Sequence, residues 1–102
     1  MAHKPRMPRG LENEGQKLWT AVVGAFEMTT ADPDKLRVLF DACKTADLLK
    51  RLDAAAAKAP LTVKGSMNQE VINPLIGQAQ TSRMQLAQLL ARLNFAPAEE
   101  DD

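Results

Sequence analysis

The chain has 102 residues, and its thirteen basic and thirteen acidic side chains give a formal net charge of zero. A single cysteine excludes an internal disulfide, and no apolar run approaches the roughly 20 residues that a membrane-spanning helix needs. The N-terminal residues also lack the apolar core of a signal peptide. We therefore expect one small intracellular domain without a membrane segment.

The neutral total conceals an uneven distribution of charge. Basic residues lie among prolines near the start of the sequence, and acidic residues close it. These residues are Lys4, Arg6 and Arg9 at the start and Glu99, Glu100, Asp101 and Asp102 at the end. Because a local basic segment can meet phosphate even on a neutral protein, we expect a flexible basic arm over residues 1–12. Residues 13–95 would form one domain, followed by an acidic tail over residues 96–102.

A first amphipathic helix is predicted over residues 14–27, with Asn13 as its N-cap. Its apolar side chains recur at helical spacing and include Trp19, the only tryptophan. A tryptophan on such a stripe favours a place in the core or in a subunit interface over contact with a ligand.

A second, longer helix is predicted over residues 33–59, because Asp-Pro is a helix start signal and Pro60 disfavours helical geometry in the residue before it. Asp47 lies at the edge of its apolar stripe, where an unpaired carboxylate would be costly to bury. Arg83 lies on the apolar face of the last predicted helix, over residues 74–93. We therefore expect an Asp47–Arg83 ion pair between these helices or between subunits.

Residues 61–74 are the one stretch without a helical pattern. Residues 61–64 and 70–72 have the composition of short strands, and the Gly-Ser-Met-Asn-Gln segment between them favours a turn. Asn73 and Pro74 then provide an N-cap and a first helical residue. A lone two-stranded hairpin is barely stable in water, so it must pack on the helices or on another copy of the chain. The predicted fold is mainly α, in the order helix, long helix, β-hairpin (residues 61–72), helix.

No catalytic or cofactor-binding pattern is visible. The only histidine, His3, and the only cysteine, Cys43, are far apart in the sequence and provide no cluster of metal ligands. No serine or cysteine has a histidine placed to act as its base, and Gly65 and Ser66 lack the spacing of a phosphate-binding loop. We therefore predict a protein that is not an enzyme and that has no metal and no cofactor.

Several motifs follow one another in a distinctive order. They are the stripe around Trp19, the Pro-Asp-Lys-Leu helix start at Pro33, the Ala-Cys-Lys-Thr-Ala-Asp segment ending at Asp47, the Leu-Thr-Val-Lys-Gly-Ser strand and turn, the Asn-Pro-Leu start at Asn73, and Arg83 ahead of a leucine-rich end. In this order and spacing, residues 10–95 resemble the small subunit of a tailed-phage terminase, of the type common in phages and prophages of actinobacteria.

The resemblance implies a non-enzymatic part of a genome-packaging motor in the host cytoplasm. Such subunits assemble into homo-oligomeric rings, bind double-stranded viral DNA at the packaging start, and regulate a large subunit that holds the ATPase and the nuclease. On this interpretation the unpaired strand edges of the hairpin join neighbouring subunits, and the acidic tail docks on the large subunit. The expected interface residues are Trp19, Leu61, Val63, Val71 and Ile72.

DNA contact is expected from the arm and from cations on the first two helices. The candidates are Lys4, Arg6, Arg9, Lys17, Lys35, Arg37 and Lys44. Because each neutralised phosphate contributes a salt slope of only about −0.9, one chain would bind weakly and a ring would multiply the contacts. Two alternatives stay open: a small helical DNA-binding regulator, such as an antitoxin-like dimer, and an adaptor that binds only protein.

Overall fold

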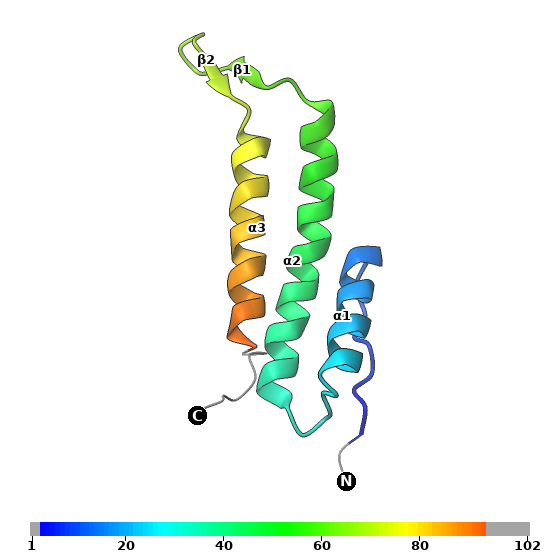
Figure 1. Cartoon of the computed structure of the whole chain (residues 1–102). Coiled ribbons are helices and arrows are strands. Elements are labelled where there is room, and N and C mark those ends of the chain that lie inside the picture. Colours follow the sequence, from blue (N-terminus) through cyan, green and yellow to red (C-terminus); the bar gives the residue numbers. More distant parts are fainter. Residues whose placement is uncertain (1–2, 94–102) are drawn as a thin grey trace.

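The computed structural model describes residues 3–93. Helices α1 (Asn13–Ala25) and α2 (Pro33–Lys58) are followed by strands β1 (Thr62–Lys64) and β2 (Glu70–Ile72) and by helix α3 (Pro74–Arg92). In Figure 1, α3 runs antiparallel beside α2 along its length, α1 covers only the N-terminal half of α2, and the hairpin stands beyond the opposite end. The molecule is elongated, with a long dimension of 61 Å. The predicted mainly helical fold with one hairpin is confirmed.

The ends of α1 and α2 follow partly from local sequence. α2 begins with Pro33 directly after Asp32, and it ends at Lys58 because Ala59 is extended before Pro60. α1 begins at Asn13, and its N-cap residue is Glu12. The predicted capping by Asn13 is therefore wrong, because the residue lies inside the helix.

Asn73 joins the end of α2 to the start of α3. Its Oδ1 accepts a hydrogen bond from the Leu75 N–H at 3.0 Å, which confirms the predicted N-cap. Its Nδ2 donates to the Pro60 carbonyl at 3.0 Å, and its own N–H donates to the Leu61 carbonyl at 2.8 Å. Asn73 is buried, and its two side-chain bonds are partly shielded from water. The base of the hairpin is thus fixed to both long helices.

The hairpin has a short antiparallel ladder. Val63 pairs with Val71, with Thr62 opposite Ile72 and Lys64 opposite Glu70. The connecting turn is closed by a 2.7 Å hydrogen bond from the Gly65 N–H to the Gln69 carbonyl. Asn68 takes a positive φ of 64° there, a conformation that asparagine tolerates better than most residues.

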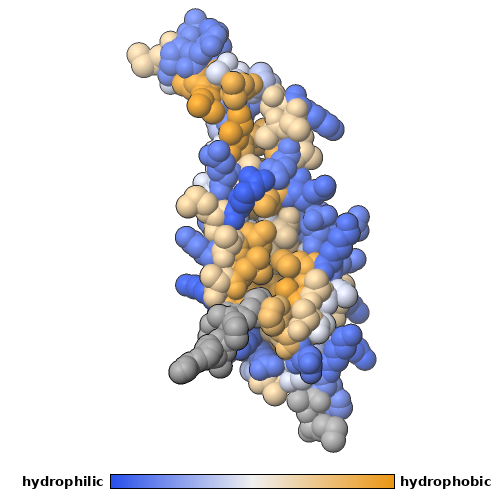
Figure 2. Space-filling model, viewed as in Figure 1, coloured by the Kyte–Doolittle hydropathy of each residue, from blue (hydrophilic) through white to orange (hydrophobic). Residues whose placement is uncertain are grey.

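The core lies where α1 meets α2 and the C-terminal end of α3. Leu39, Cys43 and Leu93 are its largest fully buried side chains, and Trp19 is 6% exposed beside them. Trp19 therefore lies in the core, one of the two places predicted for it, and little of its surface is left for a subunit interface. Beyond Asp47, α2 has no buried residue. In Figure 2, hydrophobic side chains remain visible at the surface of the α2–α3 pair.

The N-terminal segment, residues 3–12, lies against the domain and runs alongside α1 (Figure 1). The Thr30 N–H donates to the His3 carbonyl at 2.8 Å, and the His3 N–H donates to the Thr30 hydroxyl at 3.0 Å. Pro5 and Leu11 are buried. These residues therefore do not extend from the domain as the flexible arm that the sequence predicts. None of the helices within residues 3–93 is both long and apolar enough to cross a membrane.

Candidate nucleic-acid interface

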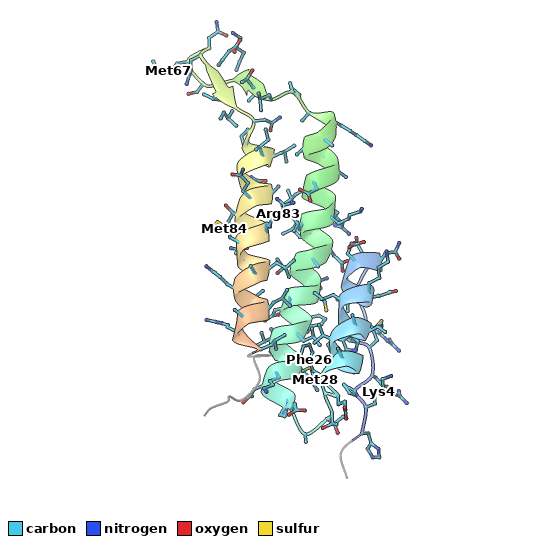
Figure 3. All side chains as sticks on the ribbon, in the orientation of Figure 1. Lys4, Phe26, Met28, Met67, Arg83 and Met84 are labelled. Carbon is cyan, nitrogen blue, oxygen red and sulfur yellow. The ribbon has the colours of Figure 1, made fainter. Side chains whose placement is uncertain are left out.

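The N-terminal segment presents its cations on the outside of α1. Lys4, Arg6 and Arg9 are all exposed, and Lys4 points away from the helices in Figure 3. Lys44 of α2 donates a 3.3 Å hydrogen bond to the carbonyl of Gly10, the residue that follows Arg9. The structure therefore brings a predicted helix cation next to the predicted arm.

Lys17 is also close to this segment, since it lines one shallow depression together with Met7. Its ammonium lies 3.7 Å from Glu14, and Arg37 lies 3.6 Å from Asp41 at the start of α2. Both cationic side chains are 76% exposed, and exposed ion pairs of this kind are worth about 0–1 kcal/mol. Such weak pairs can be exchanged for phosphate contacts.

The remaining four candidate cations are exposed. Within residues 3–93, Lys4, Arg6, Arg9 and Lys35 form no ion pair. Three of these four belong to the N-terminal segment. Among the predicted DNA-binding residues, this segment therefore has the most cations that can bind phosphate without first breaking an ion pair.

Asp47 has partners different from the one that the sequence predicts. Its two carboxylate oxygens accept the N–H of Gly15 at 2.6 Å and the N–H of Glu12 at 2.7 Å. Asp47 is 6% exposed, and these two bonds satisfy the buried charge. Arg83 instead pairs with Asp53 at 2.8 Å, on the exposed surface between α2 and α3. The predicted Asp47–Arg83 pair within one chain is therefore wrong.

Two more groups belong to the surroundings of Asp47. Arg51, one helical turn further along α2, pairs with Glu12. Cys43 lies one turn earlier, and burial, with the charge of Asp47 as a second cause, raises its pKa from 9.0 to about 12. Glu12, Gly15 and Arg51 were not predicted from the sequence. The one signal for them is Gly15, a glycine in the first turn of a helix, where it lowers helix propensity.

The hairpin exposes apolar side chains away from the core. Leu61, Met67 and Ile72 are 68%, 84% and 65% exposed, whereas Val63 and Val71 are half-buried. A second apolar surface is a groove of about 530 Å³ between α2 and α3, lined by residues that include Leu48, Leu52 and Gly77. The hairpin lies beyond the half of α2 that α1 covers, and the groove lies on the side of α2 that faces α3.

Two further sequence-based expectations concern ligands and the C-terminal tail. In the part of the chain that the structure describes, no group of three or more His, Cys, Asp or Glu side chains is placed to hold a metal ion. The predicted docking residues Glu99, Glu100, Asp101 and Asp102 lie outside the described residues.

Comparison with known proteins identifies the family. A family model described as phage terminase, small subunit, matches residues 15–102, which is most of the chain. No curated protein and no solved structure matches. The family match does not distinguish the actinobacterial type, which stays a prediction. The chain belongs to the family of phage terminase small subunits, which are non-enzymatic components of viral genome packaging.

Proposed function

We propose that the chain binds double-stranded viral DNA at the packaging start, as a ring of identical subunits in the host cytoplasm, and regulates the large ATPase and nuclease subunit. The observation that supports DNA binding most strongly is the row of exposed cations on the N-terminal segment. Lys4, Arg6 and Arg9 have no ion pair in the described chain, and Lys44 lies beside them.

A single chain offers few phosphate contacts. Each contact adds about −0.9 to the slope of log K against log salt, so three or four of them give weak binding at physiological salt. Several copies that present the same segment to one duplex raise the overall affinity without any new kind of contact. DNA binding and assembly therefore depend on each other in this proposal.

The half of the molecule that α1 does not cover supports the proposed assembly into a ring. Away from α1, the α2–α3 pair and the hairpin leave leucine and isoleucine side chains in water. A second copy that covers Leu61 and Ile72 would remove this apolar surface from solvent, at about 25 cal/mol for each Å² buried. The hairpin of one copy and the α2–α3 groove of the next are different surfaces, and a contact between different surfaces forms a ring when the rotation between neighbours closes.

The experiment for DNA binding compares two matched charge variants. Arg6→Gln/Arg9→Gln removes two cations from the N-terminal segment, and Lys58→Gln/Lys64→Gln removes two from the hairpin end of the molecule. Affinity for duplex DNA is measured from low to physiological salt by fluorescence anisotropy. We expect the first variant to weaken binding and to reduce the salt slope by about 2 per chain, and the control to change neither.

Equal effects of the two variants would contradict a role for the N-terminal segment. An absence of binding by the unaltered chain at every salt concentration would contradict the DNA-binding function and favour an adaptor that binds only protein.

Docking of the large subunit is proposed for Glu99, Glu100, Asp101 and Asp102. Four adjacent carboxylates attract a basic surface, and the attraction weakens with added salt. Removal of these four residues should reduce capture of the large subunit in a pull-down at low salt. Full retention of the large subunit would refute this part of the proposal.

A further inference from the structure

Three side chains on one face of α2 hold the start of α1 and the residues before it. Lys44 donates to the Gly10 carbonyl, Asp47 accepts the N–H groups of Glu12 and Gly15, and Arg51 pairs with the Glu12 carboxylate. Spacings of three and four residues place Lys44, Asp47 and Arg51 on the same side of a helix. We call these three residues the α2 latch.

We propose that the α2 latch positions the basic N-terminal segment for DNA, with Asp47 as the central positioning residue. This inference rests on the proposed DNA binding. It assigns Asp47, an acidic residue that would repel phosphate, an indirect role in a phosphate-binding surface. Nothing in the family match assigns that role.

Asp47 is central because its carboxylate is buried, and its bond to the Gly15 N–H is buried with it. The first N–H groups of a helix have no partner within the helix, and a carboxylate is favourable at that end. Asp47 supplies the carboxylate from a different helix, 32 residues from Gly15 and 35 from Glu12 in sequence. In contrast, the Arg51–Glu12 pair has side chains that are 69% and 47% exposed, so it adds less.

The latch also fixes the direction in which the chain leaves α1. Gly10 has a φ of +92°, a left-handed conformation that favours glycine, and its carbonyl is held by Lys44. From this bend, residues 3–9 run alongside α1 to the contact between His3 and Thr30. A segment that is already ordered loses less conformational entropy on binding. The latch therefore favours DNA binding without a DNA contact by Asp47.

The experiment uses Asp47→Asn in the full chain, with Asp53→Asn as the control. Both substitutions remove one negative charge from α2, and this change alone would strengthen binding to DNA. An asparagine at position 47 keeps the size but directs an NH₂ donor toward one of the two N–H groups. We expect Asp47→Asn to bind duplex DNA several-fold more weakly at low salt, while Asp53→Asn binds as the unaltered chain does or slightly more tightly.

Hydrogen exchange measured in the absence of DNA tests the α2 latch independently of DNA binding. We expect the amides of residues 3–15 to exchange faster in Asp47→Asn and at the unaltered rate in Asp53→Asn. Unchanged exchange in Asp47→Asn would overturn the latch. If Asp47→Asn exchanged faster but bound DNA as tightly as Asp53→Asn, the positioning role of Asp47 would be overturned. A failure of the unaltered chain to bind DNA would refute the proposed function while the exchange result still decides whether the latch exists.

A second variant is used if Asp47→Asn does not fold, as shown by loss of its helical circular dichroism signal. Glu12→Gln breaks the exposed pair with Arg51 and leaves both bonds from backbone N–H groups to Asp47 in place. We expect a smaller increase in exchange over residues 3–12 and a smaller loss of DNA affinity. No change in either measurement would overturn the latch.

Discussion

Gly15 and Asp47 lie on different helices, and the backbone N–H of Gly15 is 2.6 Å from the carboxylate of Asp47. A Cβ atom on residue 15 would lie 2.5 Å from that carboxylate and 2.8 Å from the Cys43 carbonyl. Overpacking of this kind costs about 1–3 kcal/mol, at least as much as the roughly 1 kcal/mol that alanine gains over glycine in a helix. We expect Gly15→Ala to lower the free energy of unfolding, measured by urea denaturation.

Gly24 is the matched control for this prediction. It lies in the same helix, and a Cβ atom there would have no neighbour within 4 Å. Gly24→Ala should therefore raise the free energy of unfolding by up to about 1 kcal/mol. If Gly15→Ala were as stable as Gly24→Ala, the close approach of α1 to α2 would be wrong.

Asn73 provides a second test of stability. Replacement by alanine removes the cap of α3 and the bond to the Pro60 carbonyl, both partly buried. We expect Asn73→Ala to lower the free energy of unfolding by about 1–2 kcal/mol. Asn13→Ala should change it little, because no side-chain hydrogen bond caps α1 at Asn13. Equal losses at the two positions would contradict these two cap assignments.

The two helix starts explain what the sequence could and could not predict. Asn73 and Pro74 act on the helix that they begin, so local sequence was sufficient there. The start of α1 depends on Asp47, 32 residues from Gly15. Local sequence does not show that a residue so far along the chain accepts these N–H groups. It therefore favoured Asn13, the nearest residue of a capping type, which is incorrect.

The same reason applies to the N-terminal segment and to Arg83. Proline and basic residues predicted a free arm, but Pro5 and Leu11 are buried, and His3 is hydrogen-bonded to Thr30, 27 residues away in sequence. The helical period placed Arg83 on the face toward α2, which is correct. The helical period does not predict which carboxylate of α2 Arg83 contacts. The pairing with Asp53 depends on the relative position of α2 and α3 along their common axis.

Cys43 leads to a prediction on pH and reactivity. Because its pKa is raised from 9.0 to about 12, the folded chain keeps a proton that the unfolded chain loses between these pH values. Its contribution to stability is therefore fully present below pH 9 and is lost as the pH rises toward 12. We expect iodoacetamide at pH 8 to modify Cys43 in urea and not in the folded chain, as read by mass spectrometry. Rapid modification of the folded chain would contradict the burial of this thiol.

The central claim, a ring joined through the hairpin, is tested most directly by native mass spectrometry at micromolar concentration. The unaltered chain is compared with Leu61→Ser/Ile72→Ser, and with Met84→Ser, which changes an exposed methionine of α3. We expect the unaltered chain and Met84→Ser to form one closed assembly of more than two copies, and the hairpin variant to dissociate into smaller species. A monomer, or a dimer that the hairpin variant leaves intact, would contradict the ring, and the dimer would favour a DNA-binding regulator instead.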